Sequence, residues 1–205
     1  MLSSILSIAL LLATAFGAPT LNATNSFATL TAAGNIVRIH DVANLGWGVD
    51  PGYPDAPEFT PVNGVTALAT TTPTNQDWIL VPVDTGTFKI QSAMFPDMFI
   101  SYASIGVPAT TPIHSQLVLR GNANAAIFSL QTIAAGQTVN ILIPAINKVI
   151  SSWTTTLTDT TTPITVTNAQ AGSTRQTFQF IVIGEYSCNQ YAEREANLNS
   201  NSLVE

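Results

Sequence analysis

The chain has little charge and a single cysteine. Only 9% of its 205 residues are charged, and six basic residues stand against twelve acidic ones. So few cations leave no basic stripe that a phosphate backbone could follow, which argues against nucleic acid as a partner. With Cys188 as the sole cysteine, internal disulfides are excluded and the fold must depend on a hydrophobic core. The 46% of hydrophobic residues is enough for one such core, so we expect one folded domain.

The longest apolar run lies at the N-terminus. Residues 2–16 are apolar, end in small side chains and are too short for a comfortable membrane span. We predict that residues 1–17 are a signal peptide cleaved before Ala18, which makes the protein secreted and extracellular, with no membrane span. A buried N-terminal helix is the alternative. Residues 18–26 follow as an N-terminal segment that contains Asn22, in the one tripeptide suited to N-glycosylation.

Helical periodicity is absent between residue 20 and the C-terminal tail. Val, Ile, Thr and Phe alternate with polar residues in short runs, which are broken by turns such as Asn63-Gly64. This pattern predicts an all-β domain. Residues 185–205 are rich in Asn and Ser and have few large apolar side chains, so we expect a mobile polar tail.

Three apolar runs led by an aromatic residue recur at a fixed spacing. Trp78, Phe128 and Phe178 open them, 50 residues apart in each case. A strand that begins after a glycine also recurs in each copy, and the isoleucines that end these strands, Ile39, Ile90 and Ile141, are 51 residues apart. Two further short strands lie between these in each copy, so the sequence predicts twelve strands in three pseudo-repeats of about 50 residues. The repeats cover about residues 27–83, 84–133 and 134–183. A unit that cannot bury its own apolar face favours a closed threefold assembly, with the recurring aromatic residues in its core.

This order of strands resembles the ricin B-type lectin β-trefoil family over residues 27–184. Within it, Asn75-Gln76-Asp77-Trp78 is similar to the Asn-Gln-x-Trp segment that closes a sugar-binding repeat in that family. The resemblance implies a β-trefoil similar to secreted fungal lectins. It also implies a carbohydrate-binding function, with glycans or glycoconjugates as partners.

The resemblance further implies a carboxylate just after the second strand of a competent repeat. Asp50 has this place in the first copy, whereas we expect Ser101 and Ser151 at the corresponding places of the other two. The first copy is also the only one with an asparagine, Asn75, before the closing Gln or its substitute. A carboxylate can accept hydrogen bonds from two sugar hydroxyls, and an amide both donates and accepts hydrogen bonds. We therefore expect at most one competent site, in the first repeat, or else a degenerate repeat that is purely structural.

The third strand of the first copy lacks the aromatic residue on which sugars stack in that family. Tyr53 and Phe59, in a proline-rich loop after Asp50, could replace it. Gln76 belongs to the candidate site by resemblance. We nevertheless expect its amide to tie backbone groups of the closing turn, as Gln176 would in the third copy.

Catalytic motifs and metal-ligand motifs are weak. Neither histidine has a serine or cysteine motif nearby, and we interpret His40-Asp41 as a surface pair at a strand end. We therefore predict no enzyme and no cofactor. Asp50, Asp55 and Glu58 could in principle hold calcium, but acidic loop residues are more often solvated, and we predict no metal site.

The alternative function is a protease inhibitor on the same scaffold, or a structural or interaction protein that acts through exposed loops. The partner of an inhibitor would be a secreted protease, the contact would come from residues 51–59 or 95–97, and Asp50 would be dispensable.

Overall fold

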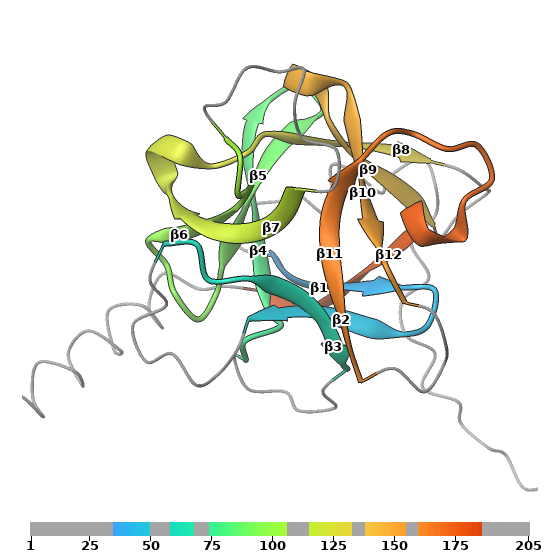
Figure 1. Cartoon of the computed structure of the whole chain (residues 1–205). Helices are drawn as coiled ribbons and strands as arrows, with labels where there is room; N and C mark the ends of the chain where they lie inside the picture. The colour runs from blue at the N-terminus through green and yellow to red at the C-terminus, as the bar shows by residue number, and fades with distance from the viewer. Residues whose placement is uncertain are drawn as a thin grey trace, which may run out of the picture.

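The structure is a computed structural model that describes residues 35–49, 58–67, 74–105, 115–132, 138–154 and 160–185. Within these ranges the chain forms twelve strands and three short 3₁₀ helices (Figure 1), which confirms the predicted all-β class and the number of strands. The predicted signal peptide, N-terminal segment and tail lie outside the described residues, apart from the end of the last strand. No helix among the described residues is long and apolar enough to cross a membrane.

Each repeat supplies four strands. The first consists of β1 (Asn35–Asp41), β2 (Leu45–Val49), β3 (Val62–Thr66) and β4 (Trp78–Asp84). The second consists of β5 (Thr87–Ser92), β6 (Met98–Tyr102), β7 (Ser115–Gly121), η1 (Asn122–Asn124) and β8 (Phe128–Thr132). The third consists of β9 (Val139–Ile143), η2 (Pro144–Ile146), β10 (Lys148–Ser152), β11 (Thr161–Thr167), η3 (Thr174–Gln176) and β12 (Phe178–Glu185).

Six of the strands pair into a closed ring. β1 pairs with β4, β4 with β5, β5 with β8, β8 with β9 and β9 with β12, all antiparallel. β12 then returns to β1, from Asn35 opposite Glu185 to Asp41 opposite Phe178, and Figure 1 shows these two strands side by side. Because the ring closes, none of its six strands is a free edge.

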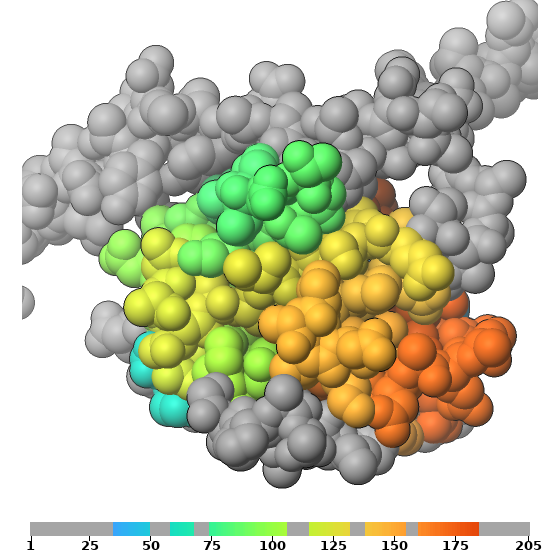
Figure 2. All heavy atoms as spheres, turned by 90° about the horizontal axis from the view of Figure 1, so that it is seen from above, coloured from blue at the N-terminus to red at the C-terminus, as the bar shows by residue number. Residues whose placement is uncertain are grey.

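The other six strands form three hairpins, β2–β3, β6–β7 and β10–β11, that are joined to the ring and to one another. β2 pairs with β1, β6 with β5 and β10 with β9. β11 also pairs with β3 and β7, and a bridge joins Pro61 to Val118. Figure 2 shows atoms of the second and third repeats side by side on one face. A closed ring of six strands with three connected hairpins is the β-trefoil fold, as predicted.

Inward side chains from all three repeats meet in one core. Trp78, Phe128 and Phe178 are each 0% exposed, which confirms that the recurring aromatic residues are core residues. The indole Nε1 of Trp78 donates to the carbonyl oxygen of Trp47 at 2.9 Å. The ring of Trp47 meets that of Phe178 edge to face, with 5.2 Å between centroids, a geometry that adds about 0.5–1.5 kcal/mol to the burial itself. The first and third repeats are therefore packed directly on each other.

The interpretation of His40-Asp41 as a surface pair is wrong. The two residues are only 7% and 5% exposed. Oδ1 of Asp41 accepts hydrogen bonds from the backbone N–H groups of Ala43 and Leu45, at 2.9 and 3.0 Å, and so shapes the turn between β1 and β2. The sequence around Asp41 indicates a turn but not that residues of another repeat bury this turn.

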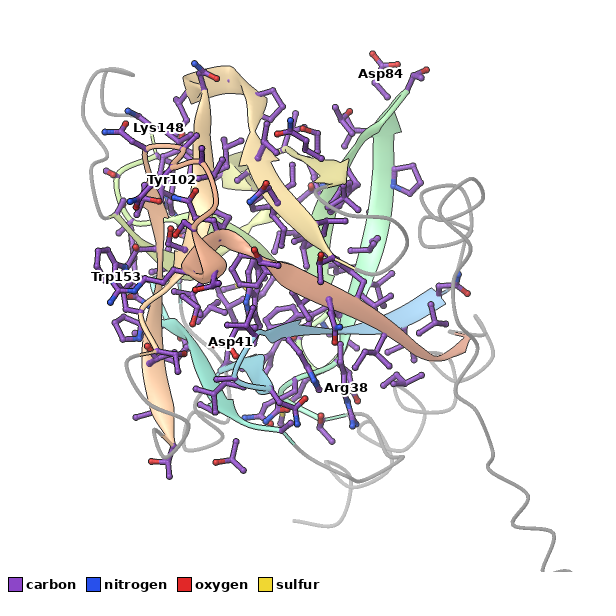
Figure 3. All side chains as sticks on the ribbon, turned by 90° about the vertical axis from the view of Figure 1, so that its right-hand side faces the viewer. Arg38, Asp41, Asp84, Tyr102, Lys148 and Trp153 are labelled. Atoms are coloured by element: carbon purple, nitrogen blue, oxygen red, sulfur yellow. The ribbon has the colours of Figure 1, made fainter. Side chains whose placement is uncertain are left out.

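The covering residues belong to the third repeat. Oδ2 of Asp41 accepts hydrogen bonds from the hydroxyls of Ser152 and Thr154, each at 2.6 Å. Figure 3 shows Asp41 toward the middle of the molecule. With both oxygens used, this one carboxylate joins the β1–β2 turn to the end of β10.

Asp41→Ala is expected to lower the free energy of unfolding by about 2–4 kcal/mol, because four donors lose a charged acceptor in a buried place. Urea denaturation measures the change. Asp84→Ala is the matched control, since Asp84 is exposed at the end of β4, and its loss should stay within about 0.5 kcal/mol. Equal losses in the two variants would contradict the role assigned to Asp41.

His40 is held neutral in the fold. Burial lowers the pKa of its imidazole and the cation of Arg38 adds to this, while the hydrogen bond with Asn44 and the charge of Asp41 act in the opposite direction. Nδ1 lies 2.8 Å from Oδ1 of Asn44. Nε2 is buried and has no hydrogen-bond partner among the described residues. A second proton on this ring would therefore have no acceptor.

The stability of the protein should therefore fall with pH below 6.5, the ordinary pKa of His40. As the pH drops, the unfolded chain takes up the proton first, so the contribution of His40 is present above pH 6.5 and is lost toward its lower folded-state pKa. Urea denaturation of wild type and His40→Gln, between about pH 7.5 and pH 5.5, should show the difference between them shrinking. A constant difference over this range would refute a buried neutral imidazole.

Candidate functional site

Asn75 lies beside the end of β2. Its carbonyl oxygen accepts a hydrogen bond from the backbone N–H of Val49 at 3.1 Å, and its side-chain Nδ2 donates to the carbonyl oxygen of Val49. Asp50 follows Val49 directly in the chain but lies outside the described residues. Asn75 is thus bonded to the residue that directly precedes Asp50 in the chain, although 25 positions separate Asp50 and Asn75 in sequence.

The amide of Asn75 keeps an acceptor for a ligand. The side chain is half-buried, and Nδ2 is held by Val49. Among the residues that the structure describes, no hydrogen bond uses Oδ1 of Asn75. An oriented amide with a fixed nitrogen and an uncommitted oxygen can accept a hydrogen bond from a hydroxyl group at little further entropic cost.

A buried ion pair anchors the turn that carries Asn75. Nε of Arg38, on β1, lies 2.8 Å from Oδ1 of Asp77, and Oδ2 of Asp77 accepts the backbone N–H of Thr74 at 2.6 Å. Removal of either partner would leave an uncompensated charge inside the protein. Sequence reasoning missed this pair. The available signal was an arginine inside an apolar strand and an acid directly before a core tryptophan.

Gln76 is 2% exposed and belongs to the framework of the site. Its Nε2 donates to the carbonyl oxygen of Thr66, the last residue of β3, at 2.8 Å. A Cβ atom at Gly46 would lie 2.5 Å from Oε1 of Gln76, and one at Gly48 would lie 3.0 Å from its Cγ. The glutamine therefore lies flat on β2 where that strand has no side chains, and its amide ties backbone as the sequence suggested.

Gln176 makes the same connection in the third repeat. It is buried, and its Nε2 donates to the carbonyl oxygen of Asn168 at 2.8 Å, so Asn168 corresponds to Thr66. When the strand pairings are followed back from Asn168 and from Thr66, Ser152 is found to correspond to Val49. The residue after it, Trp153, therefore corresponds to Asp50.

The expected counterparts of Asp50 are accordingly wrong by two positions. Ile100 and Ile150 occupy the buried place of Trp47 on the second strand of each repeat, so Ser101 and Ser151 correspond to Gly48. The true counterparts of Asp50 are Ala103 and Trp153. The first repeat remains the only one with a carboxylate at this place.

Phe59 is exposed, and its ring is engaged by the second repeat. It is 51% exposed and adopts a left-handed backbone conformation with φ of 71°, which is uncommon for a bulky residue. Its N–H donates to the carbonyl oxygen of Leu119 at 2.8 Å. The guanidinium carbon of Arg120 lies over its ring, 4.2 Å from the centroid. One ring face is thus already occupied by a cation from β7.

The remaining acidic and aromatic candidates divide between described and undescribed residues. Tyr53 and Asp55 lie outside the described residues. Glu58 accepts the backbone N–H of Gly121 at 3.0 Å, and this hydrogen bond is the main cause of the lowered pKa of its carboxyl group. Arg120 is 3.4 Å from it and acts in the same direction. No group of three potential metal ligands occurs among the described residues.

The loop at residues 95–97, one of the two contact loops of the inhibitor alternative, is held against the protein. Phe95 is partly buried against the core, and its N–H donates to the hydroxyl of Ser92 at 3.1 Å. The carbonyl oxygen of Pro96 accepts the side-chain amide of Gln91 at hydrogen-bond distance. The aromatic residue of this loop is therefore only partly exposed to solvent.

Solved structures are similar to this chain in fold, whereas no protein-family model and no curated protein match it significantly. ThreeFoil, a designed threefold-symmetric protein, covers 71% of this chain and 97% of its own, with a TM-score of 0.57 and 13% identity. A ricin B-like lectin of Macrolepiota procera, solved with lactose, covers 73% and 96%, with a TM-score of 0.57 and 15% identity. The Rhizoctonia solani agglutinin covers 73% and 95%, with a TM-score of 0.56 and 17% identity. At these identities the likeness shows the β-trefoil fold alone.

Gln76→Ala is expected to lower the free energy of unfolding by about 1–3 kcal/mol, because the carbonyl oxygen of Thr66 loses its partner and β2 loses its cover. Gln179→Ala is the matched control, since Gln179 is exposed on β12, and its effect should stay within about 0.5 kcal/mol. Urea denaturation measures both. A stable Gln76→Ala protein would show that the amide does not hold the framework.

Proposed function

We propose that the protein is a secreted carbohydrate-binding module of the ricin B-like type, with one site for a neutral saccharide in the first repeat. Asp50 accepts hydrogen bonds from adjacent sugar hydroxyls, and Asn75 accepts a further one through Oδ1. The observation that carries the proposal is the double connection of Asn75 to Val49, because it holds the amide beside the residue that Asp50 follows. Gln76 ties the closing turn to the backbone of the first repeat and does not touch the ligand.

The chemistry of the pair fits a sugar. A saccharide presents neighbouring hydroxyl groups that both donate and accept, and a carboxylate next to an amide provides complementary partners. The Arg38–Asp77 ion pair and the amide of Gln76 fix the turn before any ligand arrives, so less ordering entropy is lost on binding. The lactose-bound Macrolepiota procera lectin, similar in fold, shows that this scaffold can hold a saccharide.

The proposal includes secretion and non-catalytic action. The apolar residues 2–16 support export, and a single competent site supports binding without crosslinking by a monomer. His40 is the only histidine among the described residues, and its buried ring is committed to Asn44, so it supports no acid–base role. The anchored Phe95 gives no support to an inhibitor contact at residues 95–97.

Two substitutions test the site. Asp50→Asn keeps the shape and removes the charge, and Asn75→Ala removes the amide. Each should weaken sugar binding about tenfold or more, because a hydrogen bond to a charged or oriented group is lost. A glycan array selects the ligand, and calorimetry on the best neutral oligosaccharide measures the affinity.

Asp84→Ala controls for the loss of a carboxylate elsewhere, and thermal melting followed by circular dichroism shows that each variant is folded. If wild type retains no glycan, or if the Asp50→Asn protein binds as tightly as wild type, the proposed site is wrong.

A further inference from the structure

The third repeat carries a different pair of residues at the places of Asp50 and Asn75. The alignment of Gln76 with Gln176 makes Arg175 the counterpart of Asn75, and the strand registers make Trp153 the counterpart of Asp50. The same scaffold position that offers hydrogen-bond acceptors in the first repeat therefore offers an indole and a guanidinium here.

These two residues are stacked on each other. The guanidinium carbon of Arg175 lies over the ring of Trp153, 5.0 Å from its centroid. The indole Nε1 donates to the hydroxyl of Thr165, on β11, at 2.6 Å, which fixes the orientation of the ring. Trp153 is half-buried, and Figure 3 shows it at the periphery of the molecule, away from Asp41.

The guanidinium of Arg175 is oriented by the indole, but its N–H donors remain available to a ligand. Arg175 is exposed, and within the described ranges it forms no ion pair and no hydrogen bond. A guanidinium has up to five N–H donors in one plane and no acceptor, so it cannot replace Asp50 as a partner of neutral hydroxyls. It is instead matched to a planar carboxylate, which it can bind through two parallel hydrogen bonds.

We propose that the third repeat binds a carboxylate-bearing saccharide through Arg175, with Trp153 as its positioning residue. The carboxylate of the ligand takes the N–H donors of Arg175, and the sugar ring lies against the accessible part of the half-buried indole. This site is independent of Asp50 and Asn75, since it shares no residue with them. It goes beyond the neutral-sugar site in both place and chemistry.

The overall charge of the protein makes a general affinity for anions unfavourable, so the site must be specific. The protein has a net charge of −6 and only six basic residues, so it does not attract anions at long range. Binding must depend on the local geometry of one guanidinium. For this reason Arg175→Lys, which keeps the charge but loses the planar fork, should behave like Arg175→Ala.

Tryptophan fluorescence provides a local signal for the test. Of the three tryptophans, Trp47 and Trp78 are 0% exposed, so a ligand that changes the emission acts on Trp153. The full-length protein is titrated with methyl glucuronide, with methyl glucoside as the neutral counterpart and with a glutamate-rich peptide as a carboxylate source without a sugar. We expect a response to the glucuronide that is at least about tenfold stronger than to either of the others.

The variants decide the assignment. Arg175→Ala and Arg175→Lys should each weaken glucuronide binding about tenfold or more, while Asp50→Asn leaves it unchanged. Trp153→Phe, which keeps a ring under the guanidinium but removes the fluorophore, should retain most of the affinity by calorimetry. Equal binding of glucuronide and glucoside, equal or tighter binding of the peptide, unaltered binding by the Arg175 variants, or no binding by wild type would each overturn the proposal.

Discussion

Closure of the six-stranded ring is the constraint on which the rest of the structure depends. The pairing of β12 with β1 brings the end of the third repeat against the start of the first. Equivalent positions of the three repeats then face one common core, so Trp78, Phe128 and Phe178 must all be large and apolar. Polarity can differ between repeats only where side chains leave this core, which is at the ends of the hairpin strands and in the closing turns. Those are the places where the candidate sites lie.

Buried polar groups hold one junction between the first and third repeats and the closing turn of the first repeat. Asp41 connects the β1–β2 turn to β10, and Arg38 connects β1 to the turn before β4 through Asp77. Such groups are expensive to bury unless every donor and acceptor finds a partner, so they favour one arrangement of the repeats over neighbouring ones. The Arg38–Asp77 ion pair also fixes the turn that carries Asn75. The same interaction therefore stabilises the fold and positions a candidate ligand contact.

Sequence periodicity was sufficient for the fold but not for the register of the site. Recurring aromatic residues and glycines predicted twelve strands, and Gln76 and Gln176 were expected to tie backbone, as they do. The counterparts of Asp50 were misplaced by two residues, because a shift of two leaves every strand side chain on the same face and is invisible to alternation. Burial of Asp41 was equally hidden, since Ser152 and Thr154 lie 111 and 113 positions away.

Once the register is known, the three repeats differ in chemistry at one equivalent pair of positions. The first has Asp50 and Asn75, which mainly accept hydrogen bonds. The second has Ala103 and Ala125, whose side chains neither donate nor accept hydrogen bonds. The third has Trp153 and Arg175, which offer a ring and donors. Because the three repeats share the same pattern of strand pairing, the differences at this pair change the side-chain chemistry there without changing the closure of the ring. The threefold scaffold therefore separates folding from the recognition that we propose, and both proposed sites lie where its symmetry is broken.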